Sequence, residues 1–249
     1  MPPSILVEAC VDTIASAIAA GEGGADRVEL CANLIEGGTT PSAGTLALAR
    51  THLEIPIHVL VRPRGGDFLY SEAEFAVMEA DIRQALAAGA DGVVIGALCA
   101  DGTVDVDRTA RLIDLARPMA VTFHRAFDVC RDRGGALEDL VALSVERVLT
   151  SGGAAHAPAG APAIRRLVDQ AAGRIGILPG GGITPANAMS LVEHTGVSEI
   201  HLTGAVTRQS RMDYRAEQVV IGNAPPRSEY EWSETDADVI RAVKRSLGG

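Results

Sequence analysis

The sequence predicts a single (β/α)8 barrel, or TIM barrel, with residues 1–249 forming one domain. Eight short and almost continuously apolar segments alternate with amphipathic stretches, a pattern typical of a parallel sheet covered by helices. The length of 249 residues agrees with the ~250 residues of a typical barrel of this class. The composition does not shift along the chain, so nothing in it indicates a second domain.

The expected strands are the short apolar runs of the chain. They are Ile5–Cys10, Arg27–Cys31, Pro56–Val61, Gly92–Gly96, Ala120–Arg125, Arg147–Ser151, Arg174–Pro179 and Glu199–Thr203. Helical stretches between them include Ser71–Ala88, Asp105–Ala116 and Thr184–His194.

Local signals mark where some of these helices begin. Ser71 and Glu74 have the spacing of a capping box, and Thr184 followed by Pro185 predicts an N-cap with proline at the first helical position. Residues 204–233, after the last strand, form the longest stretch without periodicity. We expect this polar, arginine-bearing stretch to be a long loop region that packs over the barrel or against a neighbouring molecule.

A weak internal repeat in the even-numbered strands fixes which side chains point into the barrel. Because side chains alternate along a strand, each set lies on one face. On the even strands, the positions expected to face the helices are Val28, Val93, Val148 and Ile200; those expected to point inward are Glu29, Val94, Leu149 and His201, capped by Cys31, Gly96, Ser151 and Thr203. On the odd strands, the inward positions are Glu8, Cys10, His58, Arg62, Thr122 and His124.

Composition and charge exclude several classes of function. The net charge of −10 opposes binding to nucleic acid or to an anionic membrane. No apolar run is long enough to span a bilayer and the first residues do not resemble a signal peptide, so we expect a cytoplasmic protein. The single lysine, Lys244, lies near the C-terminus and therefore excludes Schiff-base or pyridoxal-phosphate chemistry inside the barrel.

The predicted interior is unusually charged for a barrel, which normally contains Val, Ile and Leu. The polar inward residues are Glu8, Glu29, His58, Arg62, His124 and His201. Burying several charges is costly unless they pair with each other or with a ligand. A paired structural network is one interpretation. A functional site is the other, and we favour it because sites in these barrels lie at the C-terminal face of the strands.

Arginines and glycines near the expected barrel mouth indicate an anionic ligand. Arg62, Arg64 and Arg125 are expected to converge there, with Asp67 in the same loop as the first two. Neutralisation of these arginines by neighbouring carboxylates is the alternative. Gly180, Gly181 and Gly182 precede an expected helix, where backbone N–H groups can bind an anion, although glycines also form plain turns.

The four cysteines have neither the spacing of a disulfide framework nor that of a zinc ribbon. Cys10 and Cys31 end adjacent strands, whose axes lie ~4.8 Å apart. Two thiolates there can share a soft ion such as Cu(I), whereas zinc would need further ligands. Two small buried hydrophobic residues are the alternative. Cys99 and Cys130 also follow strands, so all four thiols are expected towards one face.

Several long motifs closely resemble those of the CutC family, from about residue 4 to the last expected helix. The most specific are residues 62–71 (RPRGGDFLYS) and 122–128 (TFHRAFD), accompanied by residues 8–12, 24–31, 36–42, 91–98, 148–152 and 179–183. The resemblance implies a cytoplasmic copper homeostasis protein with a TIM-barrel fold and oligomeric relatives. It also implies Cu(I) binding by two cysteines, which by motif are Cys10 and Cys31.

Two hypotheses follow for the function. In the first, the chain binds Cu(I) through Cys10 and Cys31 as a homo-oligomer. In the second, it is an enzyme of the lyase or isomerase type that acts on a small anionic substrate. Its acid–base or metal-binding groups would be Glu8, Glu29 and His124. The residues expected to hold that anion are Arg62, Arg64, Asp67, Arg125, Gly180, Gly181, Gly182 and His201.

Overall fold

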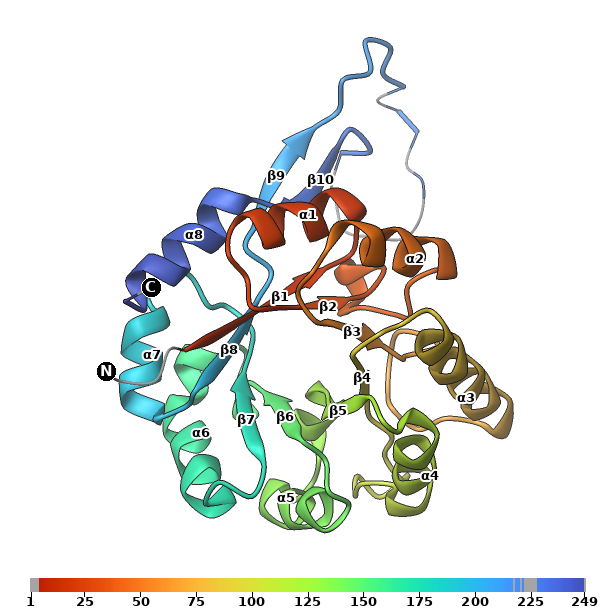
Figure 1. Ribbon diagram of the computed structural model, residues 1–249, viewed down its shortest axis with the longest axis vertical. Helices are drawn as coiled ribbons and strands as arrows, with labels where there is room; N and C mark the ends of the chain where they lie inside the picture. Colours follow the sequence, from red (N-terminus) through yellow and green to blue (C-terminus); the bar gives the residue numbers. More distant parts are fainter. Residues whose placement is uncertain (1–4, 217, 220, 222–227, 249) are drawn as a thin grey trace.

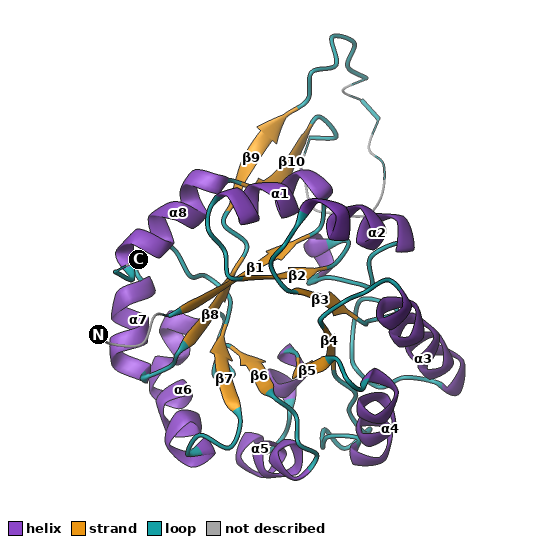
Figure 2. Ribbon diagram, in the orientation of Figure 1, coloured by secondary structure: helices purple, strands orange, loops and turns teal. Residues whose placement is uncertain are grey.

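The computed structural model describes residues 5–216, 218–219, 221 and 228–248. Eight parallel strands form a ring that helices surround on the outside, so the predicted (β/α)8 fold is confirmed (Figure 1, Figure 2). The barrel strands are β1 (Leu6–Val11), β2 (Arg27–Leu30), β3 (Ile57–Leu60), β4 (Gly92–Ile95), β5 (Ala120–Phe123), β6 (Arg147–Thr150), β7 (Gly176–Pro179) and β8 (Glu199–Leu202).

The α-helices follow the strands in the expected alternation. They are α1 (Ile14–Glu22), α2 (Ala43–His52), α3 (Glu72–Ala87), α4 (Val106–Ala116), α5 (Arg133–Ala142), α6 (Ala157–Ala171), α7 (Ala188–Thr195) and α8 (Ala237–Ser246). Short 3-10 helices occupy Leu34–Glu36 and Arg125–Val129. No helix in the described part of the chain is both long and apolar enough to cross a membrane.

Neighbouring strands pair in parallel in the order β7-β6-β5-β4-β3-β2-β1-β8. A single bridge between Gly180 and His201 joins β7 to β8 and completes the ring at its C-terminal end. The register places Glu8 beside both Arg27 and His201, and Cys10 beside Glu29. Because paired residues in a parallel sheet point to the same side, these side chains enter the barrel together.

The main hydrophobic core lies between the strands and the helices, whereas a second, smaller cluster fills part of the barrel interior. The outward residues Val28, Val93, Val148 and Ile200 are completely buried in the main core. The interior cluster consists of Cys10, Cys31, Leu60 and Val94, with Leu34 packed against it. This division is the register that the repeat predicts.

The capping box of α3 forms as predicted, but the predicted start of α7 is wrong. The side chains and backbone N–H groups of Ser71 and Glu74 bond reciprocally. By contrast, α7 begins at Ala188, after Asn187. The side chain of Asn187 accepts from the Thr184 N–H and donates to the Gly182 carbonyl, so a closed turn occupies residues 184–187 and delays the helix.

The sequence predicts a long loop region over residues 204–233, but the structure has two strands at its ends. Strands β9 (Ala205–Gln209) and β10 (Glu231–Thr235) pair antiparallel and extend away from the barrel (Figure 1). Except for the buried Thr235, the residues of both strands are exposed or half-buried, which explains why the sequence carries no apolar alternation there. Residues 217, 220 and 222–227 of the predicted loop lie outside the described residues.

Candidate metal-binding site at the barrel mouth

A cavity of about 460 Å³ lies at the C-terminal ends of the strands. The structure brings eight of the predicted site residues together in its lining, and they are Cys10, Glu29, Arg62, His124, Arg125, Gly181, Gly182 and His201. Hydrophobic side chains, among them Leu34, Leu60 and Phe68, complete much of the wall. A volume between ~300 and ~1,000 Å³ is typical of a small-molecule site.

The two cysteines predicted as a pair lie side by side at the ends of β1 and β2. The Sγ atoms of Cys10 and Cys31 are 3.8 Å apart, and both thiols are free and buried. Cys31 also donates to the Val11 carbonyl at 3.4 Å, and Cys10 lies 3.6 Å from Glu29 Oε1. Two thiol sulfur atoms and a carboxylate therefore occupy one corner of the barrel interior.

Cys10, Glu29 and His201 form a group that can hold a metal ion. Each contributes one ligand atom, and these atoms all lie within 4.8 Å of one another. The Oε2 atom of Glu29 is buried and has no hydrogen-bond partner among the described residues. A buried carboxylate oxygen without a partner is costly, so this group fits a cation better than it fits the empty protein interior.

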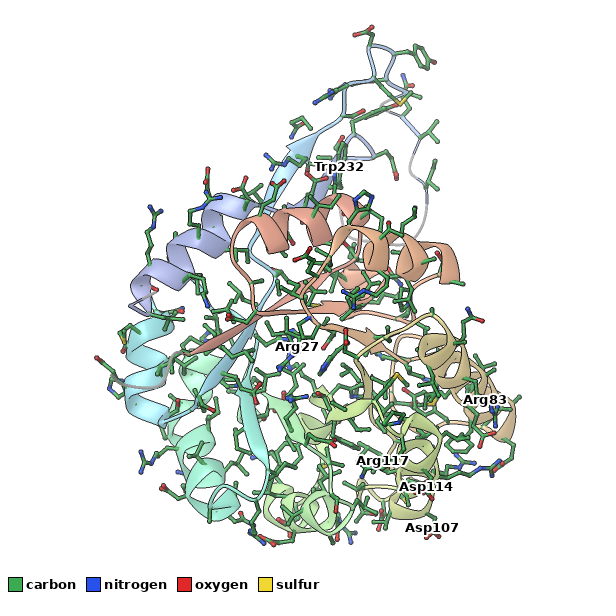
Figure 3. All side chains as sticks on the ribbon, viewed as in Figure 1. Arg27, Arg83, Asp107, Asp114, Arg117 and Trp232 are labelled. Atoms are coloured by element: carbon green, nitrogen blue, oxygen red, sulfur yellow. The ribbon has the colours of Figure 1, made fainter. Side chains whose placement is uncertain are left out.

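A chain of ion pairs beneath this group orients His201. Its Nδ1 lies 2.7 Å from Glu8 Oε1, and the other oxygen of Glu8 accepts a hydrogen bond from Arg27 Nε. Arg27 also donates to Glu199 at 2.8 Å, and Arg147 lies 3.4 Å from that same carboxylate. Arg27 lies near the centre of the ring of strands (Figure 3). A carboxylate on the far nitrogen of an imidazole is the usual support of a metal-binding histidine.

The charges in this chain favour an ionised Glu8 and a protonated His201 in the metal-free protein. Burial acts to raise the pKa of Glu8, but the hydrogen bond from His201 and the charges of His201 and Arg27 outweigh it and hold the pKa well below its usual range. Burial acts to lower the pKa of His201, but hydrogen bonds with Cys10 and Glu8 and the charge of Glu29 raise it well above its usual value.

The groups on the cavity side titrate differently. Burial raises the pKa of Glu29 to about 7. The hydrogen bond with Cys31, together with burial, raises the pKa of the Cys10 thiol well above its usual value. A cation in the cavity therefore has to displace protons, because thiolate and carboxylate are the forms that bind metal.

Arg62 lines the cavity, but its guanidinium holds loops together and does not project freely towards a ligand. Nη1 donates to the carbonyls of Glu36 and Gly38 at 2.8 Å each, and Nη2 donates to the Gly66 carbonyl at 2.9 Å. The guanidinium carbon also lies 5.1 Å from the centre of the Phe68 ring. Its role in the fold is to tie the loop after β2 to the loop after β3.

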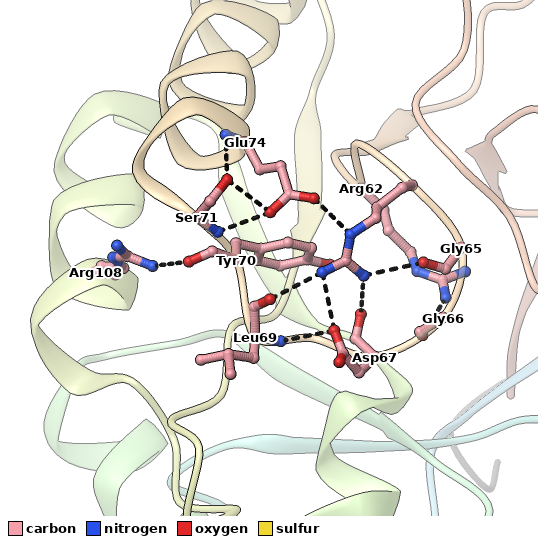
Figure 4. Close-up of polar contacts among 10 residues, drawn as sticks. Arg62, Gly65, Gly66, Asp67, Leu69, Tyr70, Ser71, Glu74 and Arg108 are labelled. Atoms are coloured by element: carbon pink, nitrogen blue, oxygen red, sulfur yellow. Dashed lines mark hydrogen bonds and ion pairs between the residues drawn. The ribbon is translucent and has the colours of Figure 1, made fainter.

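Arg64 and Asp67 do not line the cavity, so the predicted convergence of three arginines on one ligand is wrong for Arg64. Arg64 donates to Asp67 Oδ1 at 2.9 Å and to Glu74 Oε1 at 2.5 Å, and it packs on the Tyr70 ring. Figure 4 labels these three partners. Asp67 and backbone carbonyls of its own loop, together with Glu74 of α3, take up its donors, which is the neutralisation that the sequence left as an alternative.

His124 and Arg125 stand on the β5 side of the same cavity. The Nδ1 atom of His124 accepts from the Ala126 N–H at 3.1 Å, while its buried Nε2 has no partner among the described residues. Burial and the charge of Arg62 lower the pKa of His124 to about 3, so the ring is neutral and its hydrogen is on Nε2. Arg125 donates to Asp128 at 2.8 Å and to Ser151 Oγ at 2.9 Å.

The remaining predicted residues have supporting or unrelated positions. Glu8, Cys31 and Gly180 do not line the cavity: Glu8 supports His201, Cys31 lies behind Cys10 in the interior cluster, and a side chain at Gly180 would collide with Leu149. Cys130 is buried in the main core, and half-buried Cys99 points its Sγ towards the Val104 carbonyl. The thiols therefore do not form one group of four.

Sequence reasoning missed Arg27, Arg147 and Glu199, which complete the buried charge network. Each stands two residues before an inward position of its strand, at Glu29, Leu149 and His201 respectively. Because side chains alternate along a strand, the rule that places Glu29, Leu149 and His201 inside the barrel also places Arg27, Arg147 and Glu199 there. They were overlooked because a charged residue at the first position of a strand resembles the end of a loop.

Fold and site together define the class: a TIM barrel whose mouth carries a thiol, a carboxylate and an imidazole able to hold a metal ion. The CutC family model matches residues 5–206, and the chain belongs to the CutC family. The copper homeostasis protein cutC homolog of Homo sapiens is 49% identical over 238 residues, which cover 96% of this chain and 87% of that protein.

Two further relatives agree with this assignment. A family protein CutC of Chromobacterium violaceum is 50% identical over 242 residues, which cover 97% of this chain and 98% of that protein. The solved structure of a copper homeostasis protein CutC from Streptococcus agalactiae has a TM-score of 0.77 and 35% identity, and the match covers 80% of this chain and 98% of that one.

Replacing Glu8 by Gln should destabilise the protein strongly. The change leaves the buried Arg27 with one carboxylate fewer and removes the anion that faces His201, and breaking a buried pair in this way costs about 3–5 kcal/mol. Chemical denaturation would measure the loss. Glu138→Gln, which removes an exposed partner of Arg174, is the matched control and should change little. Equal effects of the two substitutions would contradict a central role for Glu8.

The pKa values of His124 and His201 should lie on opposite sides of the ordinary imidazole value of ~6.5. His124 is expected to stay neutral at about pH 5, and His201 to stay protonated at about pH 8. The free energy of unfolding should fall as the pH drops below ~6.5, because near that pH His124 takes up a proton only in the unfolded chain. The protonated His201 stabilises the folded chain below about pH 6.5, and this stabilisation is lost as the pH rises through the higher pKa that His201 has in the folded state. Ring-nitrogen NMR shifts would test both, and ordinary titration of both rings near neutrality would contradict the assignment.

Proposed function

We propose that the chain binds Cu(I) at the mouth of the barrel through the thiolates of Cys10 and Cys31, as a copper homeostasis protein. The observation that carries the proposal is the pair of free, buried thiols with sulfur atoms 3.8 Å apart. Thiolates are soft ligands that select Cu(I) over harder cations. The human and Streptococcus agalactiae relatives are named for copper homeostasis, which supports copper as the metal.

The separation of the sulfur atoms suits one shared ion. A zinc–thiolate bond is ~2.3 Å long, so two sulfurs 3.8 Å apart are within reach of a single ion of similar size with little movement of the backbone. Both cysteines come from rigid, adjacent strands, so the pair is held before the ion arrives. Glu29 and His201 lie beside Cys10 and are the available groups for a third ligand.

The buried charge network supplies the balance that such a complex requires. One Cu(I) ion with two thiolates carries a net negative charge, which is costly to bury alone. In a complex in which His201 is not a ligand, its protonated ring, backed by Glu8 and Arg27, offers a compensating charge next to the sulfurs. Because Cys10 has a raised pKa, protons compete with copper, and the affinity is expected to increase with pH.

Cytoplasmic location and assembly into a homo-oligomer belong to the same proposal. The cytoplasm keeps thiols reduced, as a Cys10 and Cys31 site requires. The projecting β9–β10 hairpin exposes Tyr214 and Trp232, apolar side chains that suit a contact between copies of the chain. Light scattering would test the assembly, and a monomer at micromolar concentration would contradict it.

Replacing both cysteines, Cys10→Ser with Cys31→Ser, should abolish tight Cu(I) binding, because hydroxyls are poor ligands for a soft ion. The affinity should fall by more than the ~10–100-fold that follows loss of a group which merely supports a ligand. Anaerobic competition with a coloured Cu(I) chelator would measure the affinity and the stoichiometry. Cys99→Ser is the control and should bind as the wild type does, because the Cys99 thiol faces the Val104 carbonyl and takes no part in the Cys10–Cys31 pair. Unchanged binding by the double variant would eliminate these two cysteines as the ligands.

A further inference from the structure

The cavity is much larger than a metal ion needs. Its volume of about 460 Å³ falls in the range of sites for organic molecules. The sulfur, carboxylate and imidazole ligands come from β1, β2 and β8. The lining that comes from the ends of β5 and β7 has no part in the copper proposal, and it is rich in hydrogen-bond donors.

His124 provides the first of these donors. Its Nδ1 is occupied by the Ala126 N–H, so the hydrogen of the neutral ring is on Nε2, which is buried and has no partner among the described residues. Gly96 and Phe68 fix the ring: an added Cβ at Gly96 would meet Nδ1 at 2.5 Å, and the Phe68 ring centre lies 4.9 Å away. A rigid, buried N–H donor without an acceptor calls for an acceptor from a ligand.

Arg125 provides the second donor and a positive charge. Nε and Nη2 are bonded to Asp128 and Ser151, but no acceptor is recorded for Nη1 in the described part of the chain. Nη1 lies beside Gly181, since an added Cβ there would be 3.7 Å from it. Arg125 therefore extends from the end of β5 towards the loop after β7.

Asp128 does not cancel this charge completely, because its carboxylate is shared among several other donors. Thr150 Oγ1 lies 2.6 Å from it, and the N–H groups of Ser151 and Gly153 each donate at 3.0 Å. Both Nη atoms of Arg62 donate to loop carbonyls, and Arg64 donates to Asp67 and Glu74 outside the cavity, whereas Arg125 keeps its Nη1 without a protein acceptor among the described residues.

Backbone N–H groups lie next to this Nη1 atom. Gly181 and Gly182 both line the cavity, and no acceptor is recorded for either N–H within the described ranges. Their φ angles of +93° and +72° are strained for other residues, and a Cβ at Gly182 would meet His156 at 2.8 Å. The sequence therefore keeps this segment free of side chains where the backbone faces the cavity.

We propose that the β5 and β7 side of the cavity binds a small organic molecule through an oxyanion, a carboxylate or a phosphate, held by Arg125, His124 and the N–H groups of Gly181 and Gly182. These donors lie in the same cavity as Cys10 but take no part in the copper proposal, so this site does not depend on that proposal. A charged donor, a neutral donor and two backbone donors match the several acceptor lone pairs of such a group. The rest of the cavity holds the carbon skeleton against Leu34, Leu60 and Phe68.

The test is a titration of the copper-free, reduced protein with two probes, lactate for the carboxylate and glycerol 3-phosphate for the phosphate, at constant ionic strength. We expect saturable calorimetric or NMR-detected binding of at least one probe. Arg125→Gln should weaken it by at least ~10-fold, as loss of a charge-assisted hydrogen bond implies. Arg64→Gln, the control, should leave it unchanged, because Arg64 lies outside the cavity.

A second measurement on the wild type keeps the test independent of the stability of any variant. The Nε2–H resonance of His124 should shift on saturation with the probe that binds, because this hydrogen then meets an acceptor. Binding of neither probe, equal weakening by Arg125→Gln and Arg64→Gln, or a His124 resonance that stays unchanged at saturation would each overturn the proposal.

Discussion

The ion pair between Glu8 and Arg27 lies inside the barrel, where most proteins of this fold pack aliphatic side chains. Both side chains are buried, so neither charge has water to stabilise it. Arg27 gains a second carboxylate from Glu199, and Glu8 gains the imidazole of His201. Each group depends on the next, which is why loss of one member would leave another charge buried without a partner.

This constraint determines what the mouth of the barrel can do. Glu8 fixes one nitrogen of His201, so the other part of that ring is presented towards Cys10 and Glu29. The sulfur atoms of Cys10 and Cys31 lie close together at the C-terminal ends of β1 and β2. Across the cavity, His124 is held by a backbone N–H and stays neutral. One side of the mouth thus offers ligands to a cation, and the other offers donors to an anion.

Much of this architecture follows from sequence periodicity. The repeat in the even strands placed Glu29 and His201 inside and Val28 and Ile200 outside, as the structure has them. Alternation along a strand is a strict geometric rule, so one correct register fixes many side chains at once. The same rule would have placed Arg27, Arg147 and Glu199 inside if it had been extended by two residues.

What the sequence could not predict depends on the directions of long side chains and on loop geometry. Arg62 and Arg64 are two residues apart, yet one reaches the cavity and the other folds back onto Asp67 and Glu74. Flexible arginines choose among many rotamers by the acceptors they find, and those acceptors come from distant loops. The start of α7 escaped prediction for a similar reason, since the side chain of Asn187 closes a turn that Thr184 and Pro185 alone do not reveal.

The most direct test of the central claim is X-ray absorption at the copper edge of the protein loaded with one equivalent of Cu(I). The account predicts two sulfur neighbours from Cys10 and Cys31, with at most one additional nitrogen or oxygen neighbour from His201 or Glu29. When His201 is that neighbour, Glu8→Gln removes the carboxylate that orients it and should alter the nitrogen signal while both sulfurs are preserved. A copper environment of nitrogen and oxygen alone in the wild type would contradict the claim.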